Sequence, residues 1–129
     1  MVRTESSCCD VRLRRTKTGE TVIPATVQEE LDRLGGFEVL SANIPVAGEL
    51  EEKSRIHRAL ADPLRLTILH LVRNQPLCVC VINRFMRIAD SKLSYHLTIL
   101  KDAGLIEGEY QGNWIIYNIT DTGRHHLEP

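Results

Sequence analysis

Four cysteines are the side chains in this sequence best suited to chemistry, and they come in two close pairs. Cys8 and Cys9 are adjacent near the N-terminus, and a single valine separates Cys78 from Cys80. In a reducing compartment, paired cysteines indicate metal binding or redox chemistry more than structural disulfides. Thiolates are soft ligands, so the ions expected here are thiophilic ones such as arsenite, cadmium or lead, with zinc as a less well-matched ion.

The spacing of the second pair restricts where it can lie. On a regular helix, two residues that are two positions apart point about 200° apart, so their sulfurs could not share one ion. Pro76 stands just before the pair and favours a helix that begins there. We therefore expect Cys78 and Cys80 at an irregular first helical turn, where the helix N-terminus also favours thiolate.

Two sulfurs do not complete a site, since three suit arsenite and four suit cadmium or zinc. Cys8 and Cys9 are the only other thiols of the chain. An N-terminal arm could bring them to the pair Cys78 and Cys80, from the same subunit or from a partner. The competing interpretation makes the second pair small core residues and the first pair incidental residues of a tail.

Length and composition favour one small globular domain. The chain has 129 residues, of which 43% are hydrophobic and 26% charged, with a formal net charge of −1. The N-terminus lacks a secretory signal and no apolar run is long enough to cross a bilayer, so we expect a cytoplasmic protein without a membrane partner. The near-neutral sum hides local clusters of positive charge at Arg12, Arg14, Arg15, Lys17, Arg84, Arg87 and Lys92.

Turn residues and apolar periodicity divide the chain into segments. Residues 1–23 read as a mobile arm, and 24–48 as a short helix over 24–36, begun by a capping box at Thr26, followed by a connector. Residues 124–129 form a tail. The segment between, 49–123, predicts helices over 49–61, 63–73, 78–87 and 91–102 and strands over 105–110 and 114–119.

The helical stripes of this central segment indicate which side chains face the core. Asp62 and Pro63 read as an N-cap and a first helical position. In the helix over 91–102, the inward residues are Leu93, Leu97 and Leu100. In the helix over 78–87, the expected inward stripe is Cys78, Val81, Ile82 and Phe85.

Two short helices joined by a tight turn and followed by a hairpin predict a winged helix-turn-helix, a mostly α fold with a β-hairpin wing (α+β). The second helix of this unit would enter the major groove of double-stranded DNA. Its expected DNA-binding side chains are Ser91, Lys92, Ser94, Tyr95 and Thr98, with His96 and Lys101 at the margins and Gln111, Gly112 and Asn113 at the wing turn. A merely solvated helix face is the alternative.

Four motifs give the sequence a resemblance to the ArsR/SmtB metalloregulators. Ala59–Leu66 (ALADPLRL) resembles the entry to their core, and Leu77–Cys80 (LCVC) the cysteine box of their arsenic- and cadmium/lead-sensing members. Ser91–Leu97 resembles their recognition helix and Trp114–Tyr117 their second wing strand. The match runs from about residue 55 to 120.

This resemblance implies a homodimer that represses transcription by binding a pseudo-palindromic operator, and that leaves the DNA when an ion binds. It implies Cys78 and Cys80 as ligands, and N-terminal cysteines such as Cys8 and Cys9 as further ones. The regulated gene would export or detoxify the ion. Zinc-sensing members use Asp and His on a last helix, but the spacing of Asp121, His125 and His126 differs from theirs.

The sequence also departs from the family pattern. Its wing carries Glu107 and Glu109 in place of positive charge, which argues against strong phosphate contact there. The C-terminal helix that often completes the dimer is missing or very short. The helix over 24–36 would therefore carry more of the dimer contact.

Three other functions remain open from the sequence. The close thiols could form a disulfide or persulfide, which would make the protein a redox or sulfur sensor of the same fold. The acidic wing also permits a winged helix that binds protein instead of DNA. An enzyme with a cysteine nucleophile has His57, His70 and His96 available but no further supporting motif, so we expect no enzymatic activity.

Overall fold

The structure is a computed structural model that describes residues 13–128 of the chain. The chain divides into two compact units, Met1–Pro45 and Val46–Pro129, each of which is described by itself. Among the described residues, no helix is both long and apolar enough to span a bilayer.

The first unit contains two short helices, α1 (Ala25–Leu34) and α2 (Gly36–Ala42). Pro24 is the N-cap of α1 and no side chain caps the helix, so the capping box predicted at Thr26 is wrong. The connector predicted after residue 36 is also partly wrong, because a left-handed Gly35 at φ 112° ends α1 and the chain turns directly into α2. One glycine turns the helical path here without ending helix formation.

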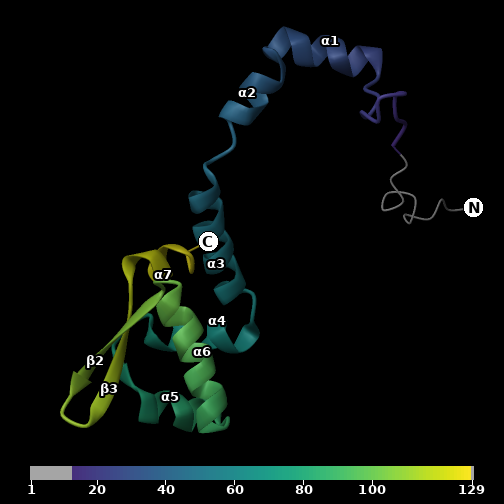
Figure 1. Cartoon of the computed structure of the whole chain (residues 1–129). Helices are drawn as coiled ribbons and strands as arrows, with labels where there is room; N and C mark the ends of the chain where they lie inside the picture. The colour runs from purple at the N-terminus through teal and green to yellow at the C-terminus, as the bar shows by residue number, and fades with distance from the viewer. Residues whose placement is uncertain (1–12, 129) are drawn as a thin grey trace, which may run out of the picture. The chain divides into compact units, whose positions relative to one another are not determined.

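The second unit has five helices and a three-stranded antiparallel sheet with the order β1-β3-β2 (Figure 1). A hairpin of β2 and β3 follows the helix pair α5 and α6, which gives the predicted mostly α, winged helix-turn-helix fold. The elements are α3 (Ala47–Leu60), α4 (Pro63–Val72), β1 (Leu77–Cys78), α5 (Val79–Met86), α6 (Asp90–Asp102), β2 (Ile106–Gln111), β3 (Trp114–Ile119) and α7 (Asp121–His125).

The core of this unit lies between α4, α5, α6 and the start of β2. Its largest fully buried side chains include Ile68 and Leu69 of α4, Ile82 of α5, and Leu93 and Leu100 of α6. The stripe predicted for α6 is therefore confirmed. Burial of these side chains fixes α6 against the helices before it, because apolar area removed from water is the main stabilising contribution to such a core.

The stripe predicted for α5 is wrong on two positions. Val81 is 49% exposed and Phe85 is 64% exposed. Ile82 is buried, and Val79 and Met86 pack beside it. Because α5 begins at Val79, its core-facing side is the row at i, i+3 and i+7, which is rotated by about one residue from the predicted row.

The predicted N-cap of α4 is confirmed. The Asp62 carboxylate accepts hydrogen bonds from the backbone N–H groups of Leu64 (2.8 Å) and Arg65 (3.2 Å), and Pro63 occupies the first turn. Burial raises the pKa of Asp62, but these backbone donors and the Arg65 charge outweigh it and hold the pKa below its ordinary value. The cap therefore fixes the corner between α3 and α4.

Candidate functional site

Cys78 and Cys80 lie where a strand gives way to a helix. Cys78 has extended backbone (φ −64°, ψ 147°) and is the N-cap of α5, and its Sγ accepts a hydrogen bond from the backbone N–H of Cys80 at 3.2 Å. The two Cα atoms are 5.2 Å apart and the sulfurs are paired as a disulfide. The side chains thus converge, which the irregular first turn permits and a regular helix would not.

The strand β1 joins the thiol pair to the wing. Leu77 pairs with Tyr117 of β3, and Cys78 pairs with Ile116. The sequence does not predict this strand, because two residues are too short to show a period. A shift of the Cys78 backbone would reach the second wing strand directly through these pairs.

A side-chain hydrogen bond joins the thiol helix to the next helix. The Asn83 Nδ2 donates to Oδ1 of Asp90, the first residue of α6, at 2.6 Å. Asn83 Oδ1 is buried and has no partner among the described residues. The sequence assigns Asn83 no role, since an isolated asparagine on a short helix carries no pattern of its own.

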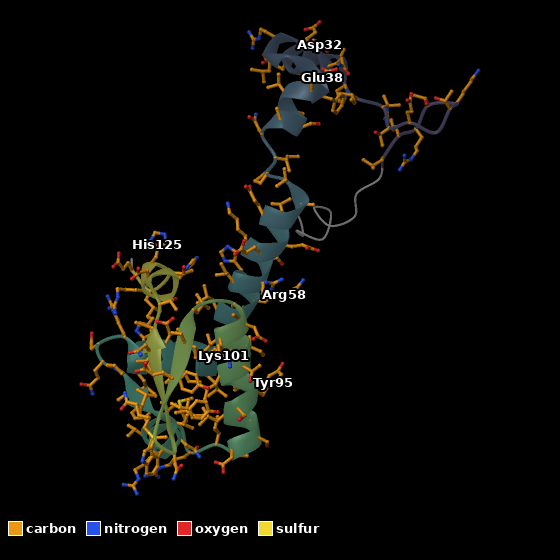
Figure 2. The ribbon with its side chains drawn as sticks, turned by 60° about the vertical axis from the view of Figure 1, so that its left-hand side comes forward. Asp32, Glu38, Arg58, Tyr95, Lys101 and His125 are labelled. Atoms are coloured by element: carbon orange, nitrogen blue, oxygen red, sulfur yellow. A yellow bond between two sulfur atoms is a disulfide. The ribbon has the colours of Figure 1, made fainter. Side chains whose placement is uncertain are left out.

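The outer face of α6 carries most of the side chains expected to read DNA. Tyr95 is 60% exposed, and it and Lys101 are labelled along α6 in Figure 2. The hydroxyl, phenol and ammonium groups of this face can bond to phosphates and base edges. The exposed residues are Ser91, Lys92, Ser94, Tyr95, Thr98 and Lys101.

His96 does not lie on that face, which corrects its place among the expected DNA contacts. It is only 4% exposed, and its Nδ1 is 3.0 Å from Nη1 of Arg65. One helical residue after Tyr95, the side chain is turned into the unit instead of outward. Burial lowers the pKa of His96, so the neutral ring accepts the hydrogen bond from Arg65.

Arg65 is the residue that holds the recognition helix to its support, and the sequence did not reveal it. Its Nε donates to the carbonyl of Ala59 at 2.8 Å and its Nη2 to the carbonyl of Arg58 at 3.1 Å. With the bond to His96, one guanidinium connects the last turn of α3, the first turn of α4 and the middle of α6.

The wing is a tight hairpin with an acidic first strand. Gln111 pairs with Trp114, so Gly112 and Asn113 form the turn, and Gly112 takes the positive φ of 63° that such a turn needs. All three predicted wing residues are exposed, and Gln111 donates to the carboxylate of Glu109. No lysine or arginine occurs between residues 103 and 119.

The described residues supply only part of an ion site. Cys8 and Cys9 lie outside them, so their expected role is not placed. Within residues 13–128, no group of three or more His, Cys, Asp or Glu side chains is positioned to hold a metal ion. The donor set does fit a thiophilic ion in kind, because Cys78 and Cys80 bring two sulfurs together beside a helix N-terminus.

Residues 62–108, from the N-cap of α4 into the wing, match the profile of a family described as bacterial regulatory protein, arsR family. An uncharacterized HTH-type transcriptional regulator of Methanocaldococcus jannaschii is 39% identical over 72 residues, covering 55% of this chain and 81% of that protein. The chain belongs to the ArsR family. It is a regulatory protein of this family and not an enzyme.

Two further similarities extend the comparison of this ArsR-family chain. The arsenical resistance operon repressor of Bacillus subtilis is 45% identical over 65 residues, which is 50% of this chain and 62% of the repressor's length. The homodimeric winged helix-turn-helix DNA-binding domain of a possible ArsR-family regulator from Mycobacterium bovis is 30% identical. It superposes with a TM-score of 0.58 over 63% of this chain and 75% of that one.

Proposed function

We propose that this protein is a homodimeric transcriptional repressor that binds operator DNA and is released when a thiophilic ion binds to its cysteines. The observation that carries the proposal is the position of the thiol pair. Cys78 and Cys80 converge at the start of α5, and α5 is bonded through Asn83 to the first residue of α6. An ion at the sulfurs would therefore act next to the helix that presents the DNA-binding face.

For DNA binding, we assign the contacts to the exposed face of α6 and to the wing turn. Lys92 and Lys101 neutralise phosphates, and the hydroxyls and Tyr95 bond to phosphates or bases. The acidic β2 makes the wing the weaker contact. The proposed contact residues are Ser91, Lys92, Ser94, Tyr95, Thr98, Lys101, Gln111, Gly112 and Asn113.

For dimerisation, we assign a role to the segment 24–48. None of the residues of α1 and α2 is buried, and large apolar side chains such as Leu34 (64% exposed) and Phe37 (59% exposed) face water. Such an apolar surface favours a partner, and a second copy of the chain is the partner that a pseudo-palindromic operator requires. The homodimeric relative from Mycobacterium bovis supports the same assembly.

For the ion, arsenite, cadmium and lead all suit the reduced pair. Arsenous acid would form two As–S bonds with Cys78 and Cys80 and release two molecules of water. Cys8 and Cys9 are proposed to complete the ligand set. Ion binding and DNA binding must then weaken each other reciprocally, by about 1–3 kcal/mol of coupling free energy.

The proposal is tested by fluorescence anisotropy with labelled DNA from upstream of the protein's own gene, titrated with each ion in turn. We expect Cys78→Ser to bind DNA as the unchanged protein does but to resist release by ions. The double variant Cys8→Ser/Cys9→Ser measures the contribution of the arm. Unchanged release from Cys78→Ser would refute the role of the pair.

The same assay tests the DNA-binding face. Lys92→Ala should weaken binding and reduce the slope of log K against log salt by about 1 for each phosphate that the lysine neutralises. Lys53→Ala, an exposed lysine on α3, is the matched control and should leave the slope unchanged. Binding to any DNA that does not depend on salt would favour a protein-binding winged helix instead.

A redox sensor is the second candidate, and the pairing of Cys78 with Cys80 as a disulfide favours it. Hydrogen peroxide would oxidise the two thiols to this disulfide and be reduced to two molecules of water. Release of DNA by peroxide and arsenite at equal concentrations would support redox sensing. Release by arsenite alone would support the ion sensor.

A further inference from the structure

A cavity of about 340 Å³ lies beside the thiol pair. Cys78 and Cys80 form one side of it, and Val79, Trp114 and Ile115 form an apolar wall. Its volume lies at the small end of the range found for ligand pockets, which is roughly 300–1,000 Å³. The sulfurs therefore face a space that is larger than a single ion needs.

The remaining wall of the cavity is polar and already bonded. Asn83 and Asp90 line it, and the hydrogen bond between their side chains is 2.6 Å long. Asp90 offers a carboxylate to the cavity but no thiol. Across residues 13–128, no third ligand completes a metal site with Cys78 and Cys80.

Trivalent arsenic forms three bonds, so two thiolates leave one position to be filled. An arsenical that already carries a carbon substituent fills this position itself, and its As–C bond does not exchange with water. Such a substituent is apolar and gains free energy when it is removed from water. The wall of Val79, Trp114 and Ile115 is the surface next to the sulfurs that could receive it.

We propose that the site recognises monosubstituted trivalent arsenicals, R–As(OH)₂, with a methyl or phenyl group as R. The inference rests on the proposed function, since it names the effector class of the same cysteines. The two reduced thiols of Cys78 and Cys80 form two As–S bonds, two As–OH bonds break, and two molecules of water leave. The arsenic is neither oxidised nor reduced, and R packs against Trp114 and Ile115.

The side chain that discriminates between arsenicals is Trp114. It is 59% exposed, so it has free surface to cover R. Covering roughly 60 Å² of apolar surface of a phenyl group corresponds to about a tenfold gain in affinity. Inorganic arsenite has no such group and gains nothing from the indole.

The test uses the full-length, reduced protein with the substitutions Cys8→Ser and Cys9→Ser, which remove the thiols of the arm. Isothermal titration calorimetry measures the affinity for phenylarsonous acid, methylarsonous acid and arsenite, and intact mass gives the stoichiometry. We expect one arsenical per chain, bound at least tenfold more tightly as the phenyl compound than as arsenite. Adding Cys78→Ser should abolish this binding.

The decisive substitution is Trp114→Ala in the same background. It should weaken phenylarsonous acid about tenfold and leave arsenite unchanged. Tyr110→Ala is the matched control, because Tyr110 is an exposed aromatic residue (76%) of the wing that does not line the cavity. If Trp114→Ala lowers the melting temperature strongly, Trp114→Phe replaces it, with a smaller loss expected for the phenyl compound alone.

Equal affinities of the arm variant for all three arsenicals would overturn the inference, as would an equal loss for phenylarsonous acid and arsenite in Trp114→Ala. A separate measurement of DNA release distinguishes this failure from failure of the proposed function. If phenylarsonous acid binds selectively but no arsenical releases DNA, the proposed function fails and the ligand class stands. If arsenite releases DNA without any preference for R, only the ligand class fails.

Discussion

Removing the Arg65 guanidinium should destabilise the winged-helix unit more than any other single arginine substitution of comparable size. In Arg65→Met the aliphatic stem remains, but three hydrogen bonds disappear, to the carbonyls of Ala59 and Arg58 and to His96. The acceptors are left behind where water reaches them poorly, since Ala59 is fully buried and His96 is 4% exposed.

The magnitude follows from these three bonds. The Arg65 side chain is only 12% exposed, so each bond contributes nearly its full net value of about 1 kcal/mol, and the total is about 3 kcal/mol. The contact between Arg65 and Asp62, at 3.9 Å, adds little. With a urea m-value of about 1–2 kcal/mol/M, the unfolding midpoint should fall by roughly 1.5–3 M.

The assay is urea unfolding followed by the fluorescence of Trp114, the single tryptophan, with circular dichroism as a second probe. Protein concentration is held constant, because a dimer's midpoint depends on it. Arg124→Met is the matched control, since its exposed guanidinium makes one bond, to the carbonyl of Arg73 at 2.9 Å. A midpoint for Arg65→Met that falls no further than the control's would refute this account of Arg65.

Two further substitutions test the same corner. Asp62→Ala removes the N-cap of α4 and should cost about 1–2 kcal/mol of unfolding free energy, whereas Asp62→Asn, which keeps an acceptor, should lose less. Burial holds the pKa of His96 below its ordinary 6.5, so protons bind the unfolded chain more readily and stability falls as pH drops below that value. Urea midpoints between pH 8 and 5 should therefore fall less for His96→Gln, while the exposed control His70→Gln should keep the fall.

The sequence predicted the elements that contain enough residues to show a period or a cap. The stripe of Leu93, Leu97 and Leu100 spans two helical turns, and Asp62 followed by Pro63 combines two independent helix-start signals. Both are confirmed. The same rule explains a failure: Thr26 with Glu29 fits the capping pattern, but the chain enters α1 through Pro24 and the cap does not form.

The features that connect elements were not predictable from local pattern. β1 is only two residues long, and Cys78 joins it because of its partner Ile116 in β3. Asn83 and Asp90 are seven residues apart on different helices, and Arg65 and His96 are 31 residues apart. Their roles come from tertiary geometry, which a single sequence without aligned relatives does not display.

These connections bear on how an ion at the thiols would reach the DNA-binding face. The Sγ of Cys78 accepts the N–H of Cys80 and so caps α5; a sulfur bonded to an ion is a poorer acceptor, and the first turn of α5 would lose its cap. The Asn83–Asp90 bond joins that short helix to α6, and β1 continues into the wing sheet. Both DNA-binding elements of one protomer are thus directly connected to the segment that holds the thiol pair. Under the proposed function, coupling between ion and DNA therefore requires no route through the dimer contact.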